Sequence, residues 1–167
     1  MNPKQGYILL MSVLVVSIIL AISFGIYALS IKDLVLASYL KDSAVAFGAA
    51  DKGVECTLYW DRGYPQNGMP YTIFSTSTQY VSPLGGGVSP YCDGTQLNAL
   101  PSWSSVNNTA DSGDTDFSLA FPDGTCADIS VLKEGNSTTT IVSNGYNLCD
   151  PTNPRRTQRT IQVQGNF

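Results

Sequence analysis

Three aspartates are the best candidates in this chain for binding a metal ion. Asp111, Asp114 and Asp116 lie in the run DSGDTD, and their carboxylate oxygens are the ligands that Ca²⁺ prefers. Their spacing is not that of an EF-hand loop, which needs Asp-x-Asp/Asn-x-Asp/Asn-Gly. Aspartate and serine in a loop also form turns, because their side chains hydrogen-bond to the nearby backbone. The run is therefore compatible with a calcium site or with a simple turn.

The sequence shows no set of residues that is suited to catalysis. The chain has no histidine, so it cannot build the Ser-His or Cys-His pairs that activate common nucleophiles, nor a histidine-containing zinc site. The glycine triplet at residues 85–87 is not followed by the Lys-Ser/Thr of a phosphate-binding loop. We therefore expect no catalytic residues and a protein that is not an enzyme. A hydrolase that uses carboxylates is the alternative that this composition leaves.

The cysteines predict disulfide bonds. Cys56, Cys92, Cys126 and Cys149 are widely spaced and form no Cys-x-x-Cys pair, which zinc sites usually need. An even number of such cysteines favours two disulfides formed in an oxidising compartment. Several connectivities are possible. If Cys126 and Cys149 lie on adjacent strands of one hairpin, the expected bridges are Cys56–Cys92 and Cys126–Cys149.

The charge balance argues against a nucleic-acid-binding protein. The chain has 9 Lys and Arg against 13 Asp and Glu, so it is mildly acidic. Its basic cluster is Arg155, Arg156 and Arg159, which would suit the phosphates of DNA or of lipid head groups. Domains that bind nucleic acids are typically strongly basic. We expect no specific nucleic-acid partner, and an edge strand protected by charge is the simpler interpretation of the arginines.

An uncharged apolar segment at residues 7–31 follows a short polar leader, MNPKQG. A helix of this length spans about 37 Å, more than the roughly 30 Å hydrocarbon core of a bilayer. The apolar region of a secretory signal peptide is shorter, about 7–15 residues. We therefore predict a membrane-spanning helix. Lys4 and the free amine precede it, whereas Lys32 and Asp33 cancel after it, so the positive-inside rule places the N-terminus in the cytoplasm.

The helix is predicted to continue through residues 32–60 as an amphipathic half, because no proline interrupts it. Apolar residues recur there at spacings near three, four and seven, which marks one helical face expected to pack beneath a β-sheet. These residues are Leu36, Leu40, Ala44, Phe47, Val54 and Leu58. Within the apolar half, Gly25 is either the point of easiest local unwinding, with Ser17 and Ser23 nearby, or a site of close helix packing.

The remainder of the chain predicts a small β domain. Residues 61–115 are rich in Gly, Pro and Asn and are predicted to be mainly loop, with one strand near residues 71–81. Residues 116–167 alternate apolar and polar residues between short turns, which predicts an antiparallel β meander of three or four strands. The fold class is therefore α+β, with a long N-terminal helix packed on a small antiparallel sheet.

The leader resembles the processing site of type IV prepilins. In that family a short basic leader ends in glycine, and an aromatic residue or methionine starts the apolar helix. Lys4, Gly6 and Tyr7 match this pattern. The resemblance implies that residues 1–6 are a prepilin leader, that a prepilin peptidase cuts after Gly6 and methylates the new amine of Tyr7, and that residues 7–31 enter a filament core.

A second segment strengthens the resemblance. PilX-like minor pilins and GspK-like pseudopilins carry a basic–acidic pair and then A-F-x-A-A-[DE] at this distance from the membrane. Here Lys41 and Asp42 precede AFGAAD at residues 46–51. The block TTTIVSNGYN…RRTQRTIQVQ is also similar to the C-terminal hairpin of PilX-like proteins. The resemblance therefore implies a pilin-like fold.

One departure from the family narrows the expected role. Major pilins usually have Glu as the fifth residue of the mature chain, where it is thought to pair with the amine of a neighbouring subunit, and the residue here is Met11. A subunit without this carboxylate cannot neutralise its neighbour's buried amine. GspK-like subunits lack it too and are placed at the tip. The resemblance thus implies a minor subunit, at the tip or in priming; a lineage whose major pilin also lacks the Glu is the alternative.

The resemblance also implies partners and a location. The partners are other pilin subunits, the prepilin peptidase, an assembly platform in the inner membrane, and the lipid bilayer before assembly. The chain would cross the inner (cytoplasmic) membrane once and then join an extracellular filament. GspK-like pseudopilins bind calcium, which would make the DSGDTD aspartates a metal site; no other cofactor is expected. The alternative function is a single-pass, membrane-anchored, adhesin-like binding module that is not processed.

Overall fold

The computed structural model describes residues 3–62, 72–74, 90–97, 100, 102, 104–109, 112–134 and 138–166. Over these residues it contains one helix, α1 (Pro3–Asp61), and seven strands. The strands are β1 (Tyr91–Cys92), β2 (Thr95–Gln96), β3 (Ser104–Thr109), β4 (Ser112–Ala120), β5 (Cys126–Glu134), β6 (Thr138–Tyr146) and β7 (Gln158–Asn166). The chain divides into two compact units, residues 1–41 and 42–167.

The first unit consists of the apolar part of α1. Its helix is long and apolar enough to cross a membrane, with a mean hydropathy of 2.5 over an 18-residue window. Three serine hydroxyls in this part donate hydrogen bonds to backbone carbonyls one turn earlier, at 2.8–3.0 Å. They are Ser17 to Leu14, Ser23 to Ile19 and Ser30 to Ile26. Polar groups in hydrocarbon must be satisfied within the protein, and these bonds achieve that.

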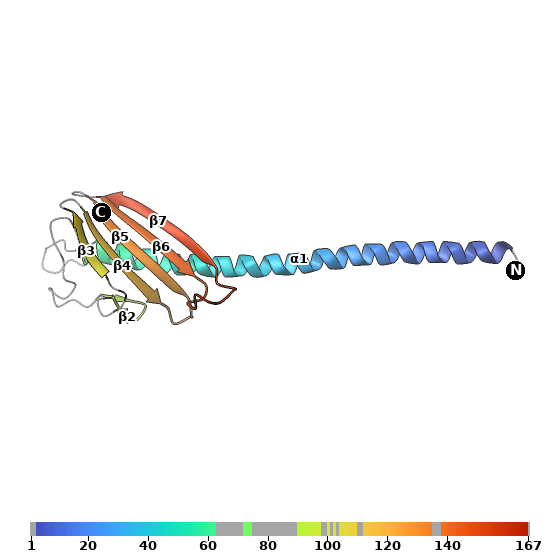
Figure 1. The fold of residues 1–167 in the computed structure, drawn as a ribbon, viewed down its shortest axis with the longest axis horizontal. Helices are drawn as coiled ribbons and strands as arrows, with labels where there is room; N and C mark the ends of the chain where they lie inside the picture. The colour runs from blue at the N-terminus through green and yellow to red at the C-terminus, as the bar shows by residue number, and fades with distance from the viewer. Residues whose placement is uncertain are drawn as a thin grey trace. The chain divides into compact units, whose positions relative to one another are not determined.

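The second unit is an antiparallel sheet with the last turns of α1 against one face (Figure 1). Its strand order is β3-β4-β5-β6-β7, so each strand pairs with the next one along the chain. A separate two-stranded hairpin, β1-β2, turns at Asp93 and Gly94, both with positive φ. The predicted α+β class, a long helix packed on an antiparallel sheet, is confirmed.

The core lies between α1 and the inner face of the sheet. In β4, β5 and β6 buried residues alternate with more exposed ones, as expected for strands with one covered face. The largest buried core side chains include Phe74, Phe117, Leu119, Ile129, Val131 and Ile141. The rings of Phe74 and Phe117 stack with their centroids 6.1 Å apart.

The helix face that packs on the sheet is only partly the predicted one. Of the predicted stripe, Val54 is buried and Leu58 is half-buried, but Phe47 is 54% exposed. Leu36, Leu40 and Ala44 are exposed as well. The covered face instead consists mainly of small residues, Ala46, Ala49, Ala50, Gly53 and Thr57. Large side chains set the apolar pattern in the sequence, whereas close approach to the sheet requires small ones.

Gly145 on β6 shows how close this approach is. A Cβ at this position would overlap the backbone nitrogen of Ala50 and the carbonyl oxygen of Ala46. One turn further along the helix, a Cβ on Gly53 would lie 2.5 Å from the hydroxyl oxygen of Ser143. Glycine is therefore required at position 145, because the backbone of the helix lies directly on the sheet there, whereas a Cβ on Gly53 would force side chains of the sheet to shift.

The prediction that residues 61–115 are mainly loop is partly wrong. The structure forms β3 at residues 104–109 and starts β4 at Ser112. These segments, SSVNNT and SGDT, lack alternating large apolar residues, and the buried positions at the start of β4 are Gly113 and Thr115. These segments are therefore strands because of backbone pairing: β3 pairs with β4, and β4 pairs with β5. Of the strand predicted at residues 71–81, residues 72–74 form a bend and no strand, and the rest lies outside the described residues.

The contact at Gly145 gives the first prediction. Gly145→Ala forces the helix away from the sheet, so we expect the free energy of unfolding to fall by about 2–4 kcal/mol. The matched control is Gly48→Ala, where an added Cβ meets no atom within 4 Å. That change should stabilise slightly, because alanine is the better helix former. Thermal unfolding of the full chain in detergent measures both, and a Gly145→Ala variant as stable as the native chain would contradict the packing described here.

Candidate functional site

The apolar side chains of α1 are the main candidate functional surface. Between Leu10 and Leu40 the large apolar side chains are 43–74% exposed. A surface of this size is far larger than the scattered apolar residues of ordinary soluble domains, and it marks a membrane or protein contact. The segment is therefore a candidate contact surface for lipid or for another protein.

The residues of the predicted processing site lie at the start of this helix. Gly6 and Tyr7 fall within the first turns of α1, and the Tyr7 side chain is 67% exposed. Met11 is one turn further and 45% exposed, and its thioether carries no charge. α1 is continuous through Gly25, and an added Cβ there would meet no atom within 4 Å. Cleavage after Gly6 and unwinding or close packing at Gly25 stay predictions.

Two disulfides pair the cysteines as expected from the sequence. Cys56–Cys92 joins α1 to the β1-β2 hairpin, with the Cα atoms 5.9 Å apart. Cys126–Cys149 joins the start of β5 to the segment after β6, with the Cα atoms 5.4 Å apart. The indole nitrogen of Trp60 also donates to the carbonyl of Tyr91 at 3.0 Å. The hairpin is thus held on the helix by a covalent bond and a hydrogen bond.

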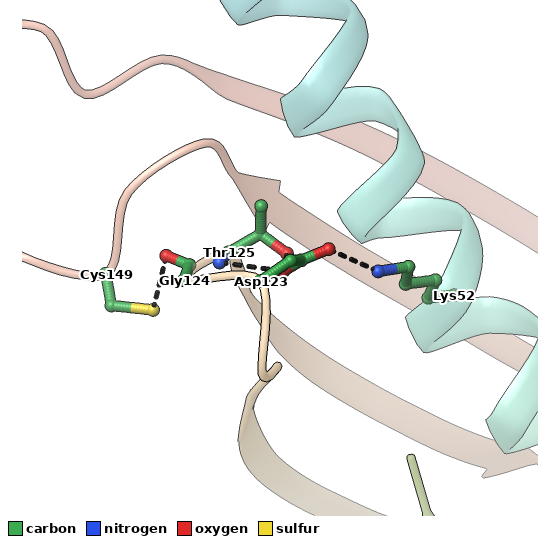
Figure 2. A network of polar contacts seen from close by, with 5 residues as sticks. All are labelled: Lys52, Asp123, Gly124, Thr125 and Cys149. Atoms are coloured by element: carbon green, nitrogen blue, oxygen red, sulfur yellow. Dashed lines mark hydrogen bonds and ion pairs between the residues drawn. The ribbon is translucent and has the colours of Figure 1, made fainter.

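A polar cluster joins α1 to the turn between β4 and β5 (Figure 2). Lys52 Nζ lies 2.6 Å from Asp123 Oδ2 and 5.0 Å from the centre of the Phe121 ring. Asp123 Oδ1 accepts from the Thr125 backbone N–H at 3.0 Å and from its hydroxyl at 2.6 Å. Hydrogen bonds from Lys52 and then Thr125 lower the Asp123 pKa from 3.8 to about 2.

The sulfur of Cys149 contacts the same turn from the side opposite to Lys52. It lies 3.5 Å from the carbonyl oxygen of Gly124, a contact drawn in Figure 2. Because this sulfur is bonded to Cys126, it carries no hydrogen to donate, and the contact is not a hydrogen bond. The positive φ of Gly124, 83°, is one that glycine adopts without strain. The turn is therefore fixed from the helix side and from the disulfide side.

A buried ion pair lies at the C-terminal end of α1. Lys133 Nζ lies 2.5 Å from Asp61 Oδ1, and the side chains are 12% and 0% exposed. Asp61 also accepts from the Thr72 hydroxyl at 2.8 Å, and Lys133 donates to the Thr139 hydroxyl at 3.0 Å. A carboxylate at a helix C-terminus faces the negative end of the helix dipole, so the ammonium of Lys133 offsets an unfavourable position. Sequence reasoning missed this pair, since nothing local relates residue 61 to residue 133.

The three arginines of the basic cluster each have a partner within the chain. Arg155 Nη2 lies 3.9 Å from Asp42 Oδ2, the acidic residue of the Lys41-Asp42 pair. Arg159 donates to the Ser43 hydroxyl at 2.6 Å. The Arg156 guanidinium lies 3.6 Å from the centre of the Tyr146 ring. These contacts connect the segment leading into β7, and β7 itself, to α1 and β6.

The predicted calcium residues are only partly described. Asp111 lies outside the described residues. Asp114 and Asp116 alternate with buried residues on β4, so both lie on the outer face of the sheet. Burial, followed by the charge of Asp116, raises the pKa of Asp114. Among the described residues no three His, Cys, Asp or Glu side chains gather to hold a metal, and two carboxylates alone do not supply the about 6–8 oxygens that Ca²⁺ takes. The described residues thus do not form a calcium site by themselves.

Comparison with models of protein families, with curated proteins and with solved structures finds no match to this chain. The geometry of the helix and the sheet and the residues of the leader are therefore the basis for assigning a function.

The Asp123 cluster predicts a specific acid sensitivity. Because the folded-state pKa of Asp123 lies below 3.8, its ionised form adds stability above that pH, and the contribution is lost as the pH falls toward about 2. Both side chains are about half exposed, so solvent screening limits the effect to about 0.5–1 kcal/mol. Asp123→Asn should lose this amount at neutral pH and show a correspondingly smaller further loss in acid.

The control for this prediction is Asp51→Asn, which removes an exposed helix carboxylate that forms no ion pair with any other described residue. Urea unfolding of the full chain in detergent, at neutral pH and at about pH 2, gives the comparison. Equal pH dependence in native and Asp123→Asn chains would contradict the assignment.

The Asp61–Lys133 pair predicts non-additive effects. Lys133→Met leaves a buried, uncompensated carboxylate, so we expect a loss of about 3–5 kcal/mol. The double variant Asp61→Asn/Lys133→Met removes the isolated charge and should recover a large part of that loss. Urea unfolding of the single and double variants measures the difference. A double variant less stable than Lys133→Met alone would show that the two groups do not compensate one another.

Proposed function

We propose that this chain is a minor pilin or pseudopilin of a type IV filament system, assembled through α1 and located at the tip or active in priming. The observation that carries the proposal is the helix α1. Its first part is apolar and exposed enough to enter either a bilayer or a bundle of like helices, and its last part is covered by an antiparallel sheet. One continuous helix thus combines a membrane segment with the support of a folded domain.

The leader residues support removal of the first six residues. Lys4 and the terminal amine hold the N-terminus at the cytoplasmic surface, because moving a charged group into hydrocarbon costs several kcal/mol. Cleavage after Gly6 removes Lys4 and leaves the amine of Tyr7 as the charge nearest to the apolar helix. The shortened helix then leaves the bilayer at a lower cost than the full chain.

Assembly replaces lipid contacts with protein contacts. Helices in an apolar environment associate through close packing and through interhelical hydrogen bonds, since the lipid tails are as apolar as the side chains. The hydroxyls of Ser17, Ser23 and Ser30 are already bonded to their own helix, so they need no partner from a neighbour. The exposed apolar side chains between Leu10 and Leu40 supply the packing surface.

Met11 supports a terminal position. A repeating subunit must neutralise the amine of its neighbour inside an apolar core, which needs a buried carboxylate there. Met11 offers only an apolar thioether, so a neighbour whose amine lies against it remains uncompensated. A subunit that begins or ends a filament avoids half of these contacts, which is why we place this chain at the tip or in priming.

The segment around AFGAAD has a packing role that agrees with this proposal. Asp42 contacts Arg155, and Ala46 and Ala50 receive the β6 backbone at Gly145. The small residues of this segment therefore set how the folded domain is attached to the helix. Its position just after the apolar part keeps the domain at the filament surface when the apolar part enters the core.

Processing by a prepilin peptidase provides the test. When the full chain is co-expressed with the peptidase, mass spectrometry should find a mature chain that begins at Tyr7 with a methylated amine. Gly6→Val should block this change, because the family's cleavage site has glycine before the cut. Gly25→Ala, a glycine substitution within the apolar part but outside the site, should be processed normally.

Retention of residues 1–6 in the native chain, with the peptidase active on a known prepilin in the same cells, would contradict the proposal. That result favours the alternative function, a single-pass membrane-anchored extracellular binding module of the adhesin type.

A further inference from the structure

The buried ion pair of Asp61 and Lys133 leaves polar groups unsatisfied. Asp61 Oδ1 accepts from the Thr72 hydroxyl at 2.8 Å and contacts Lys133 Nζ. The second oxygen, Oδ2, is buried, and within the described part of the chain no donor reaches it. Among the same residues Lys133 Nζ has two acceptors, Asp61 Oδ1 and the Thr139 hydroxyl, for its three hydrogens. Buried polar groups are normally hydrogen-bonded, so the charged form of this pair carries an uncompensated cost.

The pair lies where water is largely excluded. The side chain of Asp61 is 0% exposed and that of Lys133 is 12% exposed. The Thr72 oxygen that contacts Asp61 also accepts from the backbone N–H of Phe74 at 3.1 Å, and Phe74 belongs to the buried core. An amine and a carboxyl group are therefore held in contact with little water to solvate or separate them.

We propose that Lys133 and Asp61 condense in the folded chain to an isopeptide bond, an amide between their side chains. A proton passes from Nζ to the carboxylate, which leaves a neutral amine as the nucleophile. Nζ then attacks Cγ of Asp61, so that the Nζ–Cγ bond forms and the Cγ–Oδ2 bond breaks. Oδ2 leaves as water with the two hydrogens that Nζ loses. The ion pair thus becomes one neutral amide and one water, and no other reactant is needed.

The hydrogen bonds around the pair suit the amide better than the two ions. Oδ1 becomes the amide oxygen and still accepts from the Thr72 hydroxyl, and the remaining N–H can donate to the Thr139 hydroxyl. The oxygen that leaves as water is the one that has no donor in the ion pair. Condensation also removes a carboxylate from the negative end of the helix dipole. Each polar group that remains has a partner.

The fold supplies the conditions for this condensation. Holding two reactants in contact can raise their effective concentration to about 10⁵–10⁸ M, and exclusion of water suppresses the competing hydrolysis. The bond would join the last turn of α1 to β5, and reducing agents that open the two disulfides would leave it intact. It concerns the folded unit alone and does not depend on the filament function.

The mass of the chain provides the test, because condensation removes one water. The full chain is expressed without a prepilin peptidase, purified in detergent, and then reduced and denatured. Its mass should be one water below the mass that the sequence requires. After digestion with trypsin, cleavage after Lys133 should be absent, and the peptide 53–62, which contains Asp61, should stay joined to the peptide that contains Lys133.

Two lysine variants are the matched controls. Lys133→Arg keeps a positive charge beside Asp61, but a guanidinium stays protonated and is not a nucleophile, so this variant should have its full mass. Lys52→Arg changes the pair with Asp123, whose atoms lie 2.6 Å apart but whose side chains are 46% and 49% exposed. This variant should still lose one water, because the solvated pair does not condense.

A native chain of full mass that trypsin cleaves after Lys133 would overturn the proposal and leave the two groups as an ion pair. Loss of water that persists in Lys133→Arg would also overturn it, and so would a lighter native chain without the joined peptide, since the water would then come from another site. The digest of the native chain decides even if Lys133→Arg does not fold, because the amide survives denaturation.

Discussion

The close contact between the helix backbone and β6 is the constraint on which the folded unit depends. Gly145 leaves no room for a Cβ between the strand and the turn of α1 at Ala46 and Ala50. Such contact gains many small van der Waals interactions, and it tolerates no added atom without displacing the backbone. The position of α1 over the sheet follows from it, and so do the small residues of the covered helix face.

The other connections fix this arrangement at separate points along the helix. Arg155 and Arg159 contact Asp42 and Ser43 where the covered part begins. Lys52 reaches the β4-β5 turn, the disulfide at Cys56 holds the β1-β2 hairpin, and the buried Asp61–Lys133 pair closes the last turn. The folded unit is therefore attached to α1 at several separate points and not by one contact alone. The apolar part, by contrast, keeps its side chains available for neighbours.

The sequence predicted the general architecture because its signals are local. A long apolar run, a proline-free continuation and alternating strands after residue 116 indicate a helix on an antiparallel sheet, and cysteine spacing with hairpin geometry indicated the two bridges. The covered helix face and the polar strands were not predictable in this way. Small residues such as Ala46 and Gly145 contribute little to an apolar pattern, β3 and the start of β4 are defined by pairing, and the partners Asp61 and Lys133 are distant in sequence. The candidate site was predictable only where it is contiguous, at the leader and the apolar run.

The location of the chain in cells tests the filament account most directly. Immunogold electron microscopy, with an antibody against the folded unit, should label the ends of filaments released from cells that express the assembly machinery. Cells without that machinery should retain all of the chain in the inner-membrane fraction. Label confined to the membrane in both kinds of cell, with filaments present but unlabelled, would contradict the account.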